Sequence, residues 1–273
     1  MWDIWGYTRT GDGRFHYGDL RARKTARKAA GIKTSRADGT LTPERTLPRF
    51  NGNAKITLPR IKLKDPFSGM SHAAGALLAL AGLVFLIVES HGDPWRVTSF
   101  AVYGTTLFTL FLASALYHSL RVNPRAESAL YGFDRAAIYC LIAGTYTPIC
   151  LLALPSVLGR SLLAAVWGLA IIGIAVDVIS RRRAPNWLQA VLYLLTGWAA
   201  IVAVGPLVRS LSLPALLWLA AGCLLYSGGA VVCVIERPRL RPGVFGAHDL
   251  WHVLVLAASV CHFVVMILLA RAA

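Results

Sequence analysis

The chain has 273 residues, of which 56% are hydrophobic and only 15% are charged, and its mean hydropathy is +0.57. A soluble domain carries about 25% charged residues. The apolar residues fall in continuous runs of about 20, the length with which a helix crosses a bilayer. They do not alternate with polar residues as the strands of a membrane barrel do. These properties exclude a soluble protein and predict an all-α membrane protein that crosses the bilayer several times.

The formal net charge of +15 would suggest nucleic-acid binding in a soluble protein. Here the basic residues lie mostly in the N-terminal segment and in a few loops, so we expect them to set the membrane topology and contact anionic lipid headgroups. No nucleic-acid partner is expected. The cysteines lie inside apolar runs without CxxC spacing, which is typical of small buried hydrophobic residues. They are Cys140, Cys150, Cys223, Cys233 and Cys261.

Residues 1–66 differ from everything that follows. Residues 1–65 contain fifteen Lys and Arg and no long apolar run. This composition cannot bury enough surface to fold, so it predicts a basic, disordered cytoplasmic tail. The membrane domain is then expected to occupy residues 67–273. An alternative start at Met70 would retain every apolar segment.

Seven apolar segments follow the tail, separated by short connections rich in Pro, Gly and Asn. They cover residues 67–89, 99–120, 133–154, 161–179, 187–207, 214–235 and 247–270. With seven spans, 24 of the 28 Lys and Arg fall on the side of the N-terminus and four on the other side. The positive-inside rule therefore predicts a cytoplasmic N-terminus and an external C-terminus.

Four ionisable side chains are expected at one depth, near the cytoplasmic boundary. The second segment ends there with His118, the third begins there with Asp134, and the seventh begins there with His248 and His252. The last two are four residues apart and therefore share one helix face. Ser114 lies one turn from His118 on the same face. Ionisable residues in membrane spans are costly and are usually functional.

Three imidazoles with an open fourth position are typical of catalytic zinc sites. Zinc would lower the pKa of its bound water and polarise a carbonyl group. Asp134 could accept the proton of that water or orient a histidine ligand, and Ser114 could hydrogen-bond a reacting oxygen. The alternative is that each histidine is simply solvated at the membrane boundary. For Asp249, which lies beside His248, we expect the ordinary role of a negative charge in the first turn of a helix.

Other polar residues carry weaker expectations. His72, near the cytoplasmic end of the first segment, could hydrogen-bond to the cluster. His262 lies about 15 Å deeper than His252, too far to bind the same ion, and is expected to be packed or hydrogen-bonded. Asp177 is expected to pair with an arginine of a loop. Residues 144–148, Gly-Thr-Tyr-Thr-Pro, predict a kink in which threonine hydroxyls bind the freed backbone carbonyls.

Three of these stretches carry a family resemblance. Ser114-Ala-Leu-Tyr-His118, Asp134-Arg-Ala-Ala-Ile-Tyr139 and His248-Asp-Leu-Trp-His252 resemble the signature of the hemolysin III family. That family is grouped with the progestin and adipoQ receptors and, more distantly, with the alkaline ceramidases. The resemblance covers residues 67–270 in the right order, and the tail lies outside it.

The resemblance implies a multi-pass protein of the cell membrane, in bacteria the inner membrane, with seven spans. It implies zinc bound by His118, His248 and His252, with Ser114 and Asp134 beside it. It also implies a hydrolase-like site for lipid amides or esters in the eukaryotic relatives. The sequence leaves three functions open: a zinc-dependent lipid hydrolase that uses metal-bound water, a receptor-like membrane-homeostasis protein with structural zinc, and a pore-forming hemolysin. Substrate and oligomeric state are open as well.

Overall fold

A computed structural model describes residues 63–180, 185–238, 240–241 and 245–272, together with two short strands. The chain divides into two units, Met1–Lys62 and Leu63–Ala273. In the first unit, β1 (Thr8–Arg9) pairs antiparallel with β2 (Phe15–His16). The rest of the predicted tail up to residue 62 lies outside the described residues.

The second unit is a helical bundle, as the sequence predicted. Within the described residues, seven helical segments are long and apolar enough to cross a membrane. In chain order the elements are α2 (Pro66–Glu89), α3 (Pro94–Ser119), α4 (Pro124–Pro148), η1 (Ile149–Ala153), α5 (Val157–Ile179), α6 (Asn186–Gly197), η2 (Trp198–Ala203), α7 (Val204–Ser210), α8 (Leu213–Ile235) and α9 (Ala247–Arg271). The π-helix η1 extends the third span, and α6, η2 and α7 together form the fifth.

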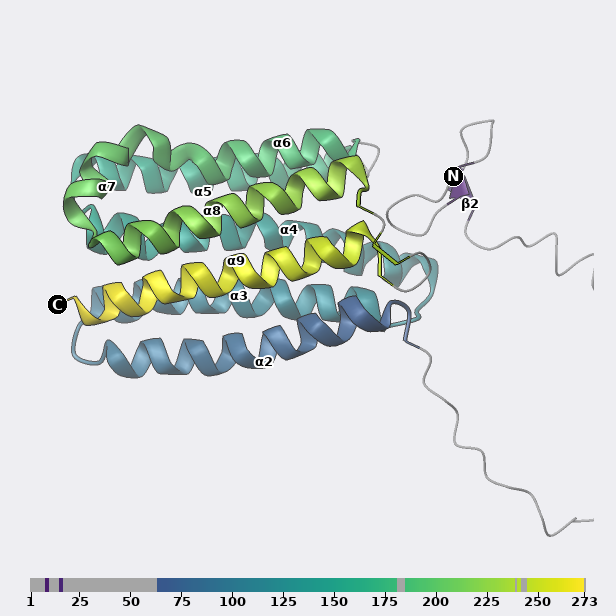
Figure 1. The fold of residues 1–273 in the computed structure, drawn as a ribbon, viewed down its shortest axis with the longest axis horizontal. Coiled ribbons are helices and arrows are strands. Elements are labelled where there is room, and N and C mark those ends of the chain that lie inside the picture. Colours follow the sequence, from purple (N-terminus) through teal and green to yellow (C-terminus); the bar gives the residue numbers. More distant parts are fainter. Residues whose placement is uncertain are drawn as a thin grey trace, which may run out of the picture. The chain divides into compact units, whose positions relative to one another are not determined.

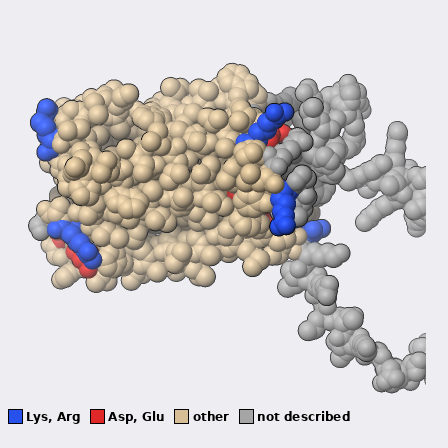
Figure 2. All heavy atoms as spheres, viewed as in Figure 1, with Lys and Arg blue, Asp and Glu red and all other residues tan. Residues whose placement is uncertain are grey.

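Consecutive spans run antiparallel along the bundle, and α9 returns to lie against α2, α3 and α8 (Figure 1). The C-terminal end of α9 therefore lies at the opposite end of the bundle from the start of α2. On the face drawn in Figure 2, charged side chains gather at the two ends of the bundle and the surface between them is uncharged. This distribution is the one that a bilayer requires.

Helix α4, the third span, begins earlier than apolarity alone predicted. It starts at Pro124, not at residue 133, because Asn123 caps it and Pro124 occupies its first position. Its first turns are polar, and Glu127 is buried there in an ion pair with Lys64, whose ammonium nitrogen is 2.7 Å from the carboxylate oxygen. The segment that precedes α2 is thereby attached to the start of α4.

The predicted irregularity in the third span is present. Pro148 ends the regular helix, and the chain continues as the π-helix η1. The hydroxyls of Thr145 and Thr147 donate to the carbonyls of Leu141 and Ala143, over 2.8 Å and 3.1 Å. These two carbonyls accept an additional hydrogen bond next to the break. The carbonyl that Pro148 frees is that of Gly144, because proline has no N–H to donate, so the threonines do not bind the freed carbonyl as predicted.

The fifth span contains a second break, which the sequence analysis did not predict. Its 3₁₀ segment η2 lies between Gly197 and the Gly-Pro pair at 205–206. The Tyr146 hydroxyl of α4 donates to the Gly197 carbonyl over 2.6 Å and accepts from the Ala200 backbone N–H over 2.8 Å. A side chain of α4 thus satisfies backbone groups at this break, as the lipid environment requires.

A buried ion pair joins α4 to α5. The predicted partner of Asp177 was a loop arginine, but its partner is Arg135 of α4, with nitrogen and oxygen 2.9 Å apart. Gln189 of α6 also donates to Asp177 over 2.5 Å. Arg135 follows Asp134 directly on α4, and neighbouring residues of a helix point in directions about 100° apart. Asp134 therefore lines the cavity described next, and Arg135 does not.

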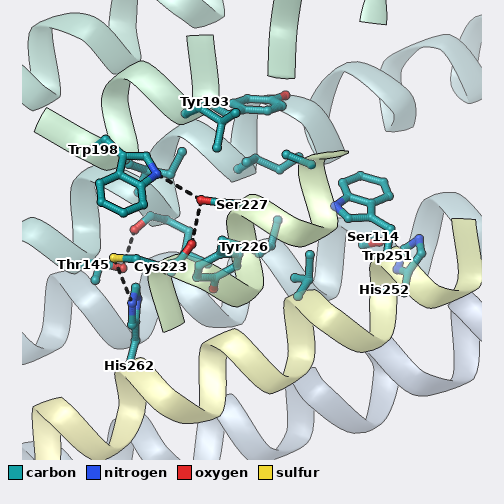
Figure 3. Close-up of a pocket in the computed structure, with 18 of the residues that line it drawn as sticks. Ser114, Thr145, Tyr193, Trp198, Cys223, Tyr226, Ser227, Trp251, His252 and His262 are labelled. Atoms are coloured by element: carbon teal, nitrogen blue, oxygen red, sulfur yellow. Dashed lines mark hydrogen bonds between the residues drawn. The ribbon is translucent and has the colours of Figure 1, made fainter. Parts of the chain in front are cut away.

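An elongated cavity of about 130 Å³ lies among α2, α3, α4, α6, α8 and α9 (Figure 3). Most of its wall is apolar. Its polar groups gather near two places, one around Ser114, Asp134 and His252 and the other around Cys223 and His262. The cavity therefore connects the predicted site to the interior of the membrane domain.

Candidate metal centre

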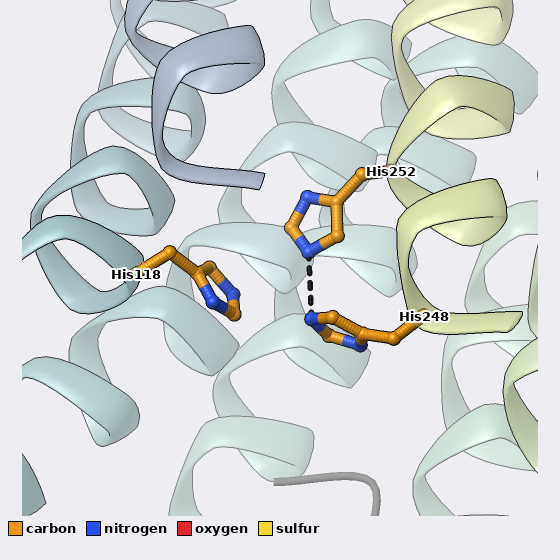
Figure 4. A group of neighbouring side chains, drawn as sticks. All are labelled: His118, His248 and His252. Carbon is orange, nitrogen blue, oxygen red and sulfur yellow. Dashed lines mark hydrogen bonds between the residues drawn. The ribbon is translucent and has the colours of Figure 1, made fainter. Parts of the chain in front are cut away.

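Three histidines from two helices converge at the end of the bundle where α9 begins. His118 comes from the last turn of α3, and His248 and His252 come from the first two turns of α9 (Figure 4). The ring centre of His118 is 5.0 Å from that of His248 and 4.8 Å from that of His252. His118 and His252 are buried, and His248 is partly buried. The structure thus brings together all three residues that the sequence analysis selected as ligands.

His118 is held by a carboxylate just before α2. Its Nδ1 lies 3.0 Å from a carboxylate oxygen of Asp65. Partial burial raises the pKa of the Asp65 carboxyl, but the hydrogen bond and charge of His118 and the charge of Lys64 outweigh this, so the pKa lies below its ordinary value. A carboxylate at Nδ1 leaves Nε2 as the ring nitrogen that can bind a metal.

A second pair holds His252. Nδ1 of His252 lies 2.8 Å from Nε2 of His72, which projects from α2. His72 is buried, and its ring also meets Phe111 edge to face, with the ring centres 5.1 Å apart. His72 therefore lies where the sequence analysis expected a hydrogen-bonding neighbour of the cluster.

The donor set fits a transition-metal ion. The candidate ligand atoms of the three histidines all lie within 4.8 Å of one another. Nε2 of His248 and Nε2 of His252 are 2.9 Å apart. Two ligands of one tetrahedral zinc with bonds of about 2.0–2.1 Å are separated by roughly 3.3 Å. Small side-chain rotations would therefore place the three nitrogens around one ion, and the group could hold a metal.

A carboxylate and a hydroxyl lie next to the histidines. Asp134 of α4 and Ser114 of α3 are both buried. Both residues line the cavity together with His252 and His72. The predicted arrangement of Ser114 and Asp134 beside the histidine cluster is therefore present in the structure.

Asp249 has the structural role that its position predicted. One carboxylate oxygen accepts from the Gly246 backbone N–H over 2.9 Å and so caps the start of α9. The other accepts from the hydroxyl of Ser68, in the first turn of α2, over 3.1 Å. Asp249 thereby links the start of α9 to the start of α2 and fixes the position of His248 and His252 along the bundle axis.

Asp65 and Ser68 are the neighbours of the site that the sequence analysis did not select. The sequence pattern places Asp65 in the tail, because no apolar periodicity includes it. One signal was present: an Asp directly before a Pro is a typical helix start, and this helix starts at the same depth as the histidines. A short polar segment at that depth can reach the site.

His262 is not part of the cluster, in agreement with its predicted depth. It lies further along α9, where its ring packs against Tyr226 and its Nε2 faces the Cys223 sulfur at 4.0 Å. All five cysteines are free, and none belongs to the group that could hold a metal.

Comparison with known proteins identifies the family. The family model described as "Haemolysin-III related" matches residues 61–263, a range that includes every residue of the candidate site. Hemolysin-3 of Bacillus cereus is 38% identical over 198 residues, which cover 72% of this chain and 87% of the relative. The Hemolysin-3 homolog of Bacillus subtilis is 36% identical over 198 residues, which cover 72% of this chain and 89% of the relative. The chain is therefore a multi-pass membrane protein that belongs to the haemolysin-III related family.

Proposed function

We propose that this protein is a zinc-dependent membrane hydrolase of lipid amides or esters. The observation that carries the proposal is the position of the histidine cluster, beside a carboxylate–hydroxyl pair and at one end of an apolar cavity. His118, His248 and His252 would hold the ion. A zinc ion in such a site supplies a Lewis acid and acidifies bound water.

The side chains around the cluster have separate roles in this proposal. Asp134 accepts the proton of the attacking water and later returns it to the leaving group. Ser114 lines the same cavity as Asp134, and its hydroxyl would donate to a reacting oxygen of the substrate. Asp65 keeps the His118 ring oriented through Nδ1 of His118. His72 does the same for the His252 ring through Nδ1 of His252.

Two features favour a lipid as the substrate. The cavity is lined mostly by apolar side chains, and it lies within the membrane-spanning helices.

The basic composition of residues 1–62 favours contact of that segment with anionic lipid headgroups. Nucleic acid is not a partner in this proposal.

The test is lipid turnover by the purified protein in lipid nanodiscs. Amides and esters of long-chain fatty acids would be offered to wild type, to chelator-treated and zinc-restored protein, and to His248→Ala. We expect turnover that chelation abolishes, zinc restores and the variant lacks. Stoichiometric zinc without turnover of any lipid offered would overturn the hydrolase proposal.

A structural role for zinc is the second candidate, because the cluster and its neighbours join α2, α3 and α9. In that receptor-like protein, metal removal would lower the thermal stability, while Asp134→Asn would leave both stability and cellular phenotype unchanged. The name of the Bacillus relatives suggests a third candidate, the pore-forming hemolysin. Liposomes that leak in proportion to the reconstituted protein would favour it, and liposomes that stay sealed would exclude it.

A further inference from the structure

The far end of the cavity contains a second group of polar side chains. His262 of α9 and Cys223, Tyr226 and Ser227 of α8 all line it (Figure 3). His252 and His262 are ten residues apart on one helix, so the two polar ends of the cavity are separated by about 15 Å. The wall between them is formed mainly by apolar residues: Leu110, Ile138, Leu141, Ile142 and Val255.

Most polar groups at this far end are satisfied by the protein. The Tyr226 hydroxyl is 2.8 Å from the Ser259 hydroxyl, and either oxygen can be the donor. The Ser227 hydroxyl donates to the Cys223 carbonyl over 2.8 Å and accepts from the Trp198 indole N–H over 3.0 Å. These bonds fix the side chains around the far end without any ligand.

His262 is the exception. Its side chain is more than nine-tenths buried, and its Nδ1 has no hydrogen-bond partner among the residues that the structure describes. A buried polar atom without a partner is destabilising. The role that the sequence analysis expected, a packed or hydrogen-bonded histidine, accounts for the ring and for Nε2 but leaves Nδ1 unexplained.

The position of this ring is also built into the fold. A Cβ atom at position 222 would lie 2.2 Å from Cδ2 and 2.4 Å from Nε2 of His262, so Gly222 allows the ring to rest directly on α8. The Tyr226 ring meets it edge to face, with the centres 5.4 Å apart. The imidazole is therefore held in one place at the cavity wall.

We infer that the cavity binds an amphiphile with two polar groups. The head of the lipid lies at the histidine cluster, and a hydroxyl or oxo group part-way along its chain forms a hydrogen bond with His262. The inference rests on the proposed function for the position of the head. It adds a substrate class, long-chain lipids that carry an oxygen function near the middle of the chain.

The test compares three fatty acids, which represent the product of the proposed hydrolysis: stearic acid, 12-hydroxystearic acid and 6-hydroxystearic acid. Binding to the full-length protein in nanodiscs is measured by calorimetry. Wild type is expected to bind the 12-hydroxy acid about fivefold to tenfold more tightly than stearic acid, the gain of one hydrogen bond. The 6-hydroxy acid places its hydroxyl against the apolar wall and is expected to show no gain.

His262→Phe should abolish the preference for the 12-hydroxy acid over stearic acid, whatever its affinity for stearic acid, and His262→Asn should retain part of that preference. Val255→Ala is the control at the apolar wall and should change the binding of all three acids alike. Equal binding of the three acids by wild type, or an equal gain from either hydroxyl, would overturn the inference without any variant. Zinc content and lipid turnover are measured separately, so failure of the proposed function remains distinguishable.

Discussion

At the residue scale, the orientation of His118 depends on a carboxylate from outside the membrane spans. Asp65 precedes α2, and its backbone N–H also donates to the His118 carbonyl over 2.8 Å. Backbone and side chain together thus hold Asp65 against the end of α3. A ligand imidazole oriented in this way binds a metal more tightly than one that can rotate.

Replacement of Asp65 by Asn should therefore weaken metal binding by about 10- to 100-fold, because a carboxylate partner at Nδ1 fixes the tautomer of the ligand. Competition with a chelator measures the affinity. Asp65→Glu should retain part of it, whereas Asp93→Asn, a matched change at the other end of α3, should leave it unchanged. An affinity of Asp65→Asn equal to that of wild type would show that Asp65 does not position His118.

Asp134 differs from the histidines in its expected effect. Because Asp134 is the proposed base, the variant Asp134→Asn should lower lipid turnover by about 100- to 10,000-fold, while its zinc content stays that of wild type. Elemental analysis and lipid turnover on the same preparation separate the two properties. Loss of the metal from Asp134→Asn would make this residue a ligand or a support of the ligands.

At the element scale, the ion pair between Arg135 and Asp177 joins α4 to α5, and Gln189 joins α6 to the same carboxylate. A buried pair can cost as much desolvation as it gains, yet the removal of one partner leaves an uncompensated charge. The pair therefore makes the packing of these three helices depend on both charges.

Asp177→Ala should destabilise the protein by about 3–5 kcal/mol, because it leaves the Arg135 guanidinium buried without its carboxylate. Unfolding in mixed micelles with increasing denaturing detergent measures the change. The double variant Arg135→Leu with Asp177→Leu should lose much less. If single and double variants were equally unstable, packing volume and not charge would explain the effect.

The sequence predicted the elements whose signal is local. Continuous apolarity identified the seven spans, and direction and depth brought His118, Asp134, His248 and His252 together. The polar first turns of α4 lacked that signal, and so did the segment that contains Asp65. The partner of Asp177 could not be read from the sequence either, because Arg135 reaches it only after α4 and α5 have packed together. The break at η2 depends on Tyr146, a residue of another helix.

At the scale of the whole molecule, the histidine cluster and its neighbours connect the first two spans to the last. Residues of α2, α3 and α9 contribute to it, and α9 lies against both other helices. Metal bound there would stabilise the folded bundle by mass action, because the unfolded chain lacks the site.

Zinc should therefore raise the midpoint of thermal unfolding. At a free concentration 100 times its dissociation constant, the stabilisation should be about 2.7 kcal/mol. A thermal shift assay across a zinc titration measures it, with His248→Ala as the control in which the midpoint should not move. An equal shift in the variant would assign the effect to zinc bound elsewhere.

The charge distribution predicts the orientation of the whole molecule. A reporter that is active only outside the cytoplasm should be active when fused after Ala272 and inactive when fused in the loop between α5 and α6, because that loop belongs to the arginine-rich side. The reverse pattern would place the histidine cluster at the outer face of the membrane.

The central claim is a zinc ion bound by three imidazoles, and X-ray absorption at the zinc edge of the purified wild-type protein tests it most directly. The account predicts one zinc per chain, with three histidine nitrogens at about 2.0–2.1 Å and no neighbour heavier than nitrogen or oxygen. Protein that lacks zinc after saturation, or a spectrum with sulfur ligands at about 2.3 Å, would contradict it.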